Sequence, residues 1–211
     1  MADRFSAVKC MKNFFLFLLF ISATFFAQSE TEKPVKSNSY AKGFFFSIGL
    51  GPRAPVGEFS ISYNIGMGLN FEASFAHSDY LPFFAIARIA YESFNASPNY
   101  IKKSEYASLI TNLLVLQFGS KFFLPSISED IGILMPTVEF AGSYAYKQLY
   151  YSLKSLQGFR DNFEWSSKFG GQIGFGISMF IMEIMGYYNF YSANEYLSLD
   201  LKIRVPISVS F

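Results

Sequence analysis

Apolar and polar residues alternate along the C-terminal fifteen residues of the chain. Every odd position from Leu197 to Phe211 is apolar, and most even positions between them are polar or charged. Period-two alternation places the two sets on opposite faces of a β-strand. Strands of soluble sandwiches are usually about 3–10 residues long. The greater length of this one favours a tilted strand that crosses a membrane and projects beyond it.

The same alternation recurs upstream and predicts eight strands in all. It is clear at 61–75, 134–147 and 165–179, and further strands are expected at about 43–51, 82–93, 105–123 and 182–191. An even number puts both chain ends on one side of a closed barrel. The outer loops then fall near 52–59, 94–104, 148–162 and 192–195. The predicted fold class is all-β, an eight-stranded antiparallel transmembrane β-barrel.

The N-terminus has the features of a signal peptide, predicted to cover residues 1–27. Arg4, Lys9 and Lys12 precede an apolar segment that runs from Phe14 to Ala27. A polar segment at 28–42 follows and is interpreted as a periplasmic linker, which leaves 43–211 for the barrel. The only cysteine, Cys10, would be removed with the signal, so no disulfide is expected.

Composition supports a membrane setting and excludes nucleic acid as a partner. The chain is 51% hydrophobic and only 16% charged, whereas soluble domains carry about 25% charged residues. After the N-terminus no run approaches the roughly 18 apolar residues of a membrane helix. Removal of residues 1–27 leaves 14 of the 17 bases and 15 of the 16 acids. A chain with so little net charge has no electrostatic footprint for nucleic acid.

Opposed residues in the predicted hairpins suggest a charge network inside the barrel. Glu72 is expected opposite Arg88, Lys147 opposite Glu164, and Glu183 opposite Arg204, all on the lumen face. An eight-stranded barrel is just wide enough for side chains to fill it, so these ion pairs are expected to plug the lumen; lining of a pore is the alternative. The full inward-facing charged set is Glu72, Arg88, Glu92, Lys121, Glu139, Lys147, Glu164, Lys168, Glu183, Asp200, Lys202 and Arg204.

Glycines on the lumen face are expected to make room for aromatic side chains. The hairpin around 180–181 sets Gly174 opposite Tyr187 and Gly170 opposite Tyr191. On the outer face it sets Phe175 opposite Gly186. Alternation of small and large residues fills the interior of a small barrel.

No constellation in the chain predicts catalysis, a metal site or a cofactor. The only histidine, His77, is followed by Ser78 and Asp79. Neighbouring strand residues point to opposite faces, so three consecutive residues rarely make a catalytic triad. Turn chemistry explains the segment. No His, Cys or carboxylate cluster has metal-ligand spacing.

The signal, the eight alternating segments and the terminal Phe211 together resemble the small outer-membrane barrels of the OmpA-domain and OmpX type. The same pattern is similar to the outer membrane protein β-barrel domain family. The resemblance covers about residues 43–211 and implies location in the bacterial outer membrane, in contact with its lipids and lipopolysaccharide. It also implies insertion by the barrel-assembly machinery, which reads a C-terminal aromatic residue on the last strand. Phe211 with Val209 fits that assembly signal.

Four functions are compatible with this pattern. The first is a non-enzymatic barrel with a structural, adhesion or assembly role and a lumen plugged by side chains, whose extracellular partner is left open. The others are a narrow channel or small-ligand transporter, a lipid A-modifying enzyme, and an accessory component of a secretion machine. The function of a protein with this fold depends on its loops and on its cellular context, and not on the fold alone.

Overall fold

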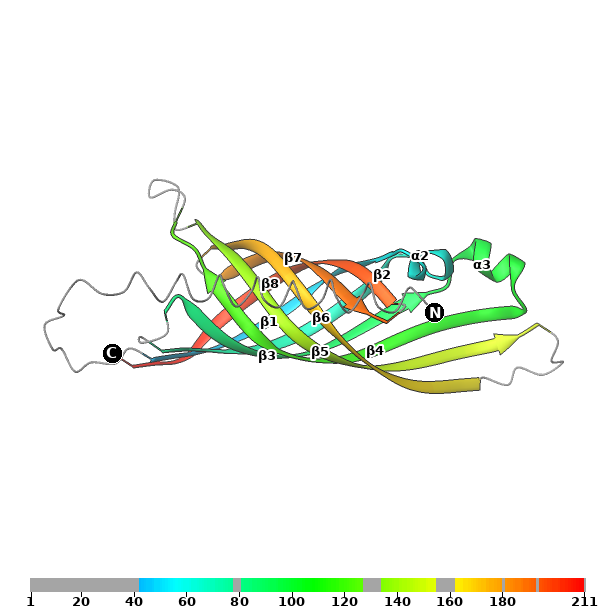
Figure 1. Cartoon of the computed structure of the whole chain (residues 1–211), viewed down its shortest axis with the longest axis horizontal. Helices are drawn as coiled ribbons and strands as arrows, with labels where there is room; N and C mark the ends of the chain where they lie inside the picture. The colour runs from blue at the N-terminus through cyan, green and yellow to red at the C-terminus, as the bar shows by residue number, and fades with distance from the viewer. Residues whose placement is uncertain are drawn as a thin grey trace, which may run out of the picture. The chain divides into compact units, whose positions relative to one another are not determined.

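The computed structural model describes residues 42–77, 81–126, 134–154, 162–179, 181–192 and 194–210, which form a closed antiparallel barrel (Figure 1). Its strands follow the order of the sequence, and β8 closes the ring on β1. They are β1 (Lys42–Val56), β2 (Gly66–His77), β3 (Phe83–Asn95), β4 (Tyr106–Phe123), β5 (Leu134–Leu153), β6 (Asn162–Met179), β7 (Met182–Tyr191) and β8 (Asn194–Ser210). The predicted all-β, eight-stranded antiparallel barrel is confirmed.

Two short helices lie between strands, α2 (Phe59–Ser62) and α3 (Pro98–Lys103). No helix in the described part of the chain is long and apolar enough to cross a membrane. β1 begins at Lys42, a residue that the sequence assigned to the linker. The predicted signal peptide, the rest of the linker and Phe211 lie outside the described residues.

The barrel is apolar outside and polar inside, the reverse of a soluble domain. Along β8 the outward Leu199, Leu201 and Ile203 are each about half exposed, whereas the alternating Asp200 and Lys202 are buried. Aromatic pairs stand on the outer surface toward both ends of the barrel. Phe83 packs on Phe122 at 4.3 Å between ring centroids, and Tyr146 stacks on Trp165 at 4.9 Å. Belts of this kind are found where a barrel meets the two membrane interfaces.

The strand register agrees with the sequence in two hairpins and differs in two others. Glu72 lies opposite Arg88, and Gly174 opposite Tyr187, as expected. Lys147 lies opposite Ser166 rather than Glu164, and Glu183 opposite Lys202 rather than Arg204. Each difference is a shift of two residues, which keeps every side chain on its predicted face because strand side chains repeat with period two.

A glycine lets β6 approach the aromatic ring that β7 places in the lumen. A Cβ atom added at Gly174 would lie 2.4 Å from ring atoms of Tyr187. No larger residue fits there without displacing the ring, so this pair follows the small-against-large rule. The neighbouring pairs, Gly170 with Tyr191 and Phe175 with Gly186, also have the predicted register.

The first outer connection differs from its prediction. Alternation had predicted one strand at 61–75, but β2 begins only at Gly66, and 59–62 form α2. The turn into α2 uses Gly57 in the left-handed region, with φ of 58°. The Ser60 hydroxyl donates to the Gly57 carbonyl at 2.7 Å. This turn aims Phe59 into the barrel mouth, where its side chain is buried, whereas Ile61 remains exposed.

Three strands continue past the ring at the end that carries α2 and α3, here called the outer end (Figure 1). We define the outer extension as Tyr106–Leu109 of β4, Tyr144–Leu153 of β5 and Asn162–Phe169 of β6. Pairing of β3 with β4 ends at Ile110, and pairing of β6 with β7 ends at Gly170. The sequence had assigned 148–162 to an outer loop, whereas β5 continues to Leu153 and β6 begins at Asn162.

We predict that arginine is poorly tolerated on the outer face of the barrel at mid-strand. Leu201→Arg should lower the free energy of unfolding by about 2–4 kcal/mol in a lipid bilayer, because the charge enters hydrocarbon near the midplane. Ile61→Arg is the matched control, since Ile61 is 69% exposed but lies on α2. It should change the stability by about 0.5 kcal/mol or less. Equal losses for the two variants would contradict the assignment of the lipid face.

Candidate functional site in the barrel lumen

The buried charged residues of the described chain form a set whose formal charges cancel. Five are acids and five are bases. All ten lie on the lumen faces of strands, where water is limited and an unpaired charge is costly. They are Arg53, Glu72, Arg88, Glu92, Lys121, Glu139, Glu183, Asp200, Lys202 and Arg204.

Arg88 on β3 is the centre of this network. Its Nε donates to Glu72 at 3.0 Å, and its Nη2 makes ion pairs with both Glu72 and Glu139. Its Nη1 donates to the side-chain oxygens of Gln117 at 3.0 Å and Gln172 at 2.8 Å. These partners lie on β2, β4, β5 and β6, so one guanidinium joins strands that are far apart around the ring.

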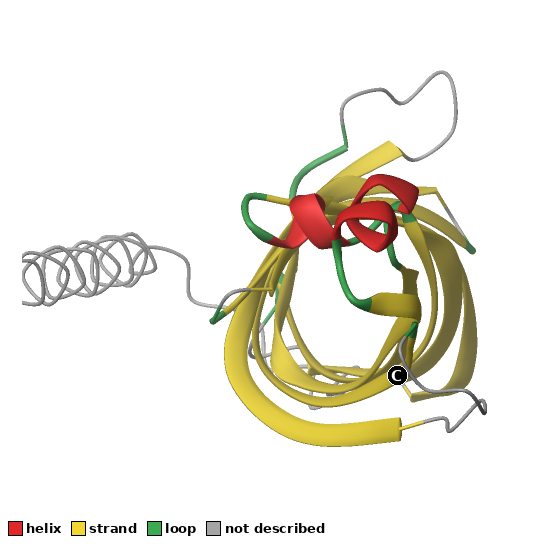
Figure 2. Ribbon diagram, turned by 90° about the vertical axis from the view of Figure 1, so that its right-hand side faces the viewer, coloured by secondary structure: helices red, strands yellow, loops and turns green. Residues whose placement is uncertain are grey.

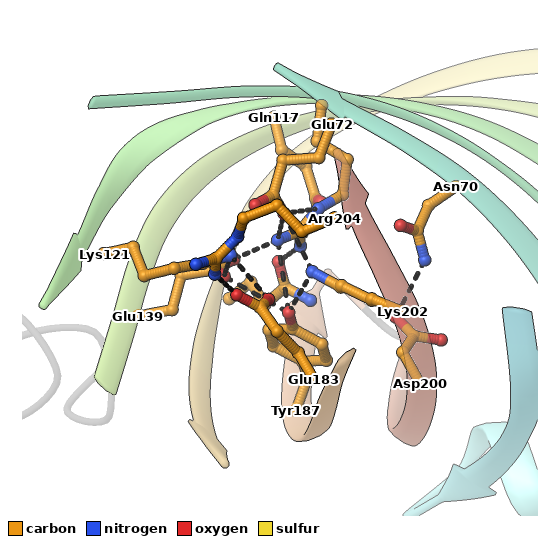
Figure 3. A network of polar contacts seen from close by, with 12 residues as sticks. Asn70, Glu72, Gln117, Lys121, Glu139, Glu183, Tyr187, Asp200, Lys202 and Arg204 are labelled. Atoms are coloured by element: carbon orange, nitrogen blue, oxygen red, sulfur yellow. Dashed lines mark hydrogen bonds and ion pairs between the residues drawn. The ribbon is translucent and has the colours of Figure 1, made fainter. Parts of the chain in front are cut away.

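Two lysines compensate the remaining charge around Glu72. Lys121 donates to Glu72 and to Glu183 Oε2, the latter at 3.0 Å. Lys202 reaches Glu72 Oε2 at 2.8 Å from the opposite side. The Tyr187 hydroxyl accepts from Lys202 and donates to Glu139 at 3.2 Å. Figure 3 shows these side chains converging on one level of the lumen.

Toward the inner end, Arg204 completes the network. It forms an ion pair with Glu183, and its guanidinium carbon lies 4.7 Å from the ring centroid of Phe123. An arginine over an aromatic face gains a cation–π attraction in addition to its ion pair. Glu183 is therefore held between Lys121 and Arg204.

A second polar group lies closer to the outer end. Arg53 Nε contacts Glu92 at 3.0 Å, and its Nη1 contacts Asp200 at 2.6 Å. The Asn70 amide donates to the other oxygen of Asp200 at 2.9 Å. Arg53 is 1% exposed. The arrangement joins β1, β2, β3 and β8 across the lumen.

Above this group, buried aromatic side chains pack together at the outer mouth of the barrel. Phe59 from α2 packs on Tyr63 at 4.6 Å and on Phe94 at 5.0 Å between ring centroids, and Phe94 packs on Tyr196 at 5.3 Å. The Tyr63 hydroxyl accepts a hydrogen bond from Thr111 at 2.7 Å. Burial raises the pKa of the Tyr63 phenol, which keeps it neutral. Figure 2 looks onto this end and shows the helices lying over one side of the ring.

The structure brings together two of the three predicted charge pairs. Glu72 contacts Arg88, and Glu183 contacts Arg204, although Glu183 and Arg204 are diagonal neighbours rather than directly opposed. The predicted opposition of Lys147 and Glu164 is wrong. Lys147 lies 5.9 Å from the Tyr63 ring centroid, and the exposed Glu164 accepts from the Tyr151 hydroxyl at 3.0 Å.

Sequence reasoning missed Arg53 and the neutral members of the network. It had placed Arg53 in an outer loop, although the alternation Gly49, Gly51, Arg53 continues the lumen face of β1. The alternation extends to Arg53, but the residues on either side of it favour a turn, so the predicted strand ended before it. Gln117 was missed because it carries no charge.

The contacts among these residues are ion pairs, hydrogen bonds and cation–π contacts. No group of three or more His, Cys, Asp or Glu side chains among the described residues is placed to hold a metal ion. His77 ends β2, and its neighbours Ser78 and Asp79 lie outside the described residues. Val209 pairs with Gly43 at the backbone, and its role with Phe211 in assembly stays a prediction.

Comparison with solved structures identifies the fold. Neisserial surface protein A is similar over 78% of this chain and 97% of its own, at 13% identity and a TM-score of 0.50. Ail, the attachment invasion locus protein of Yersinia pestis, matches over 79% and 99%, at 11% identity and a TM-score of 0.45. The N-terminal β-barrel domain of Pseudomonas aeruginosa OprF matches over 78% and 99%, at 9% and 0.38.

No protein-family model and no curated protein matches the sequence. The likeness to Neisserial surface protein A agrees with the closed ring of eight antiparallel strands described above. It also agrees with the resemblance to the OmpA-domain and OmpX type. The chain therefore has the fold of the small eight-stranded outer-membrane β-barrels.

Proposed function

We propose that the chain is a non-enzymatic protein of the bacterial outer membrane with a sealed lumen and a structural or adhesive role. The apolar outer belt supports the location, since such a surface is suited to lipid and would associate in water. We further propose that it contacts the outer-membrane lipids and lipopolysaccharide and is inserted by the barrel-assembly machinery. Val209 and Phe211 would supply the signal for that machinery.

The observation that supports a sealed lumen is the burial of charged, polar and aromatic side chains at three levels along it. The charged network occupies one level, the Arg53 group lies above it, and the aromatic residues around Phe59 fill the mouth. A permeating ion would have to displace side chains that already hold compensating charges. Breaking a buried ion pair is expensive because it leaves the partner uncompensated. The side chains thus act as a plug rather than as the lining of a pore.

A filled lumen leaves the outer end as the surface for contact with other molecules. There the outer extension and α3 project past the ring. α3 ends in Lys102 and Lys103, both exposed. Adhesion needs only a rigid platform held in the membrane, and a barrel fixed by internal ion pairs provides one.

We expect the purified full-length protein to give no stable current steps in planar lipid bilayers. A double variant, Phe59→Ala with Tyr63→Ala, tests which layer forms the seal. It removes two aromatic side chains from the mouth but leaves the charged network in place, so it should be silent as well. Large, stable conductance from the unmutated protein would contradict the plugged lumen and favour a channel.

The second prediction concerns coupling between Glu183 and Arg204. Arg204→Ala should destabilise the folded barrel in detergent, by less than the roughly 3–5 kcal/mol typical of a fully buried pair, because Lys121 still contacts Glu183. Adding Glu183→Gln should recover part of that loss. A double-mutant cycle should show a coupling of about 0.5–3 kcal/mol.

Glu195 provides the control for this cycle. It lies near the outer end of β8 and accepts from Tyr188 at 2.7 Å on the exposed surface. Arg204→Ala and Glu195→Gln should therefore be additive. If Arg204→Ala and Glu183→Gln are additive too, the two side chains do not interact in the folded protein.

A further inference from the structure

The buried charges of the lumen are balanced as a set but not level by level. In the outer group one base, Arg53, contacts two acids, Glu92 and Asp200. In the network around Arg88, four bases contact three acids within the described chain. The bases are Arg88, Lys121, Lys202 and Arg204, and the acids are Glu72, Glu139 and Glu183. The inner part of the lumen therefore holds one positive charge in excess.

Arg204 is the base of this network that follows Lys202 toward the inner end of β8, and its contacts are incomplete. Its ion pair is with Glu183, which Lys121 also contacts. Arg204 is 8% exposed, and its Nε has no hydrogen-bond partner among the described residues. A guanidinium presents its N–H donors as a planar fork that matches a carboxylate. Arg204 thus keeps a donor and a share of positive charge for an anion.

Three phenylalanine side chains form an apolar collar beside Arg204 at the inner mouth of the lumen. The ring centroids of Phe45 and Phe123 lie 5.9 and 4.7 Å from the guanidinium carbon. Phe84 packs between them, at 5.9 Å from Phe45 and 4.7 Å from Phe123 between ring centroids. The collar therefore combines residues of β1, β3 and β4 with a base of β8. Ligand sites commonly have this composition, with aromatic side chains around a few polar groups.

The collar differs from the aromatic cluster at the outer mouth in its exposure. Phe59 and Phe94 of the outer cluster are 3% and 0% exposed. The rings of Phe45, Phe84 and Phe123 are only partly buried. Apolar surface that remains in contact with water favours an apolar guest, because its removal from water lowers the free energy. The inner mouth thus offers both an apolar surface and a charged group to a ligand.

We propose that the inner mouth binds a small organic monocarboxylate with an apolar body. The carboxylate accepts hydrogen bonds from Arg204 and compensates the excess positive charge, while the apolar body packs on Phe45, Phe84 and Phe123. A single excess charge suits a monoanion better than a phosphate dianion. Arrival of the ligand from the periplasm rests on the proposed outer-membrane location, whereas the site itself does not.

Fluorine NMR with fluorophenylpropionate tests the site directly. We expect this acid to show saturable line broadening with the full-length protein in phosphatidylcholine nanodiscs, above the broadening with empty nanodiscs. Fluorophenylpropanol has the same ring but no charge, and it should bind at least about tenfold more weakly, since it loses the charge-assisted hydrogen bonds. Equal binding of the acid and the alcohol would overturn the proposal, because the charge of Arg204 would then have no part in recognition.

Two variants test the two halves of the site. Arg204→Lys keeps the charge beside Glu183 but loses the planar fork, and it should weaken the acid about tenfold. Phe123→Leu removes the ring nearest to Arg204, and it should weaken the acid about three- to tenfold. Phe123→Leu leaves every ion pair of the network in place, so it decides the outcome even if Arg204→Lys does not fold. Unchanged affinity in the folded variants would reject the collar as the site.

Lys42 provides the matched control at the same end of the barrel. It is exposed at the start of β1, so Lys42→Gln removes a positive charge without touching the collar. This variant should bind fluorophenylpropionate as the unmutated protein does. A loss equal to that of Arg204→Lys would show general attraction of anions to a basic end and would overturn the proposal.

A free acid and the C-terminal residue of a peptide offer the same chemistry, and competition distinguishes them. The peptide Gly-Ser-Gly-Phe is added to bound fluorophenylpropionate with a free or an amidated C-terminus. Displacement by the free-acid form alone assigns the site to a peptide C-terminus, and displacement by neither form assigns it to a free small acid. Displacement by the amidated form contradicts the requirement for a carboxylate. Absence of saturable binding of the fluorinated acid rejects the site, whereas the sealed lumen is judged separately by the current measurements.

Discussion

Charge compensation inside a narrow ring is the constraint on which this structure depends. Five acids and five bases are buried in the lumen, and an unpaired member would carry a large desolvation penalty. Arg88 meets this constraint by contacting carboxylates and amides from four other strands. The ring holds these groups together, and their contacts in turn hold strands that do not pair directly. A barrel with an apolar exterior needs this internal polar packing, because its outer face offers no core.

The same constraint bears on the proposed function. Charged groups and, above them, Phe59 and its aromatic neighbours are buried in the lumen, and we therefore propose that contact with other molecules takes place at the outer end. The strands there no longer close a ring, so they acquire edges. One edge is covered by α3 and the other, at Phe163–Phe169, has no strand beside it in the described chain.

The sequence was sufficient for the features that depend on period two alone. Alternation identified the strands and their faces, and the residue pairs Glu72–Arg88 and Gly174–Tyr187 followed from short inner turns. The sequence was insufficient where residues alternate between apolar and polar without forming a strand, or form a strand without such alternation. Ile61 and Tyr63 alternate with polar residues yet flank the end of a helix, since Gly57 permits a tight turn. The outer ends of β5 and β6 were shortened because residues 148–162 were assigned to a loop. The two shifted registers both follow outer connections, whose centres lie one residue away from the positions that the sequence suggested.

The stability of an Arg88→Met variant shows whether the folded barrel depends on charge compensation in the lumen. Methionine keeps much of the side-chain length but removes the charge that compensates Glu72 and Glu139. We expect the free energy of unfolding in detergent to fall by about 3–5 kcal/mol, the range for breaking a buried ion pair. A loss below about 1 kcal/mol, the size typical of an exposed ion pair, would contradict it and show that the barrel does not depend on this network.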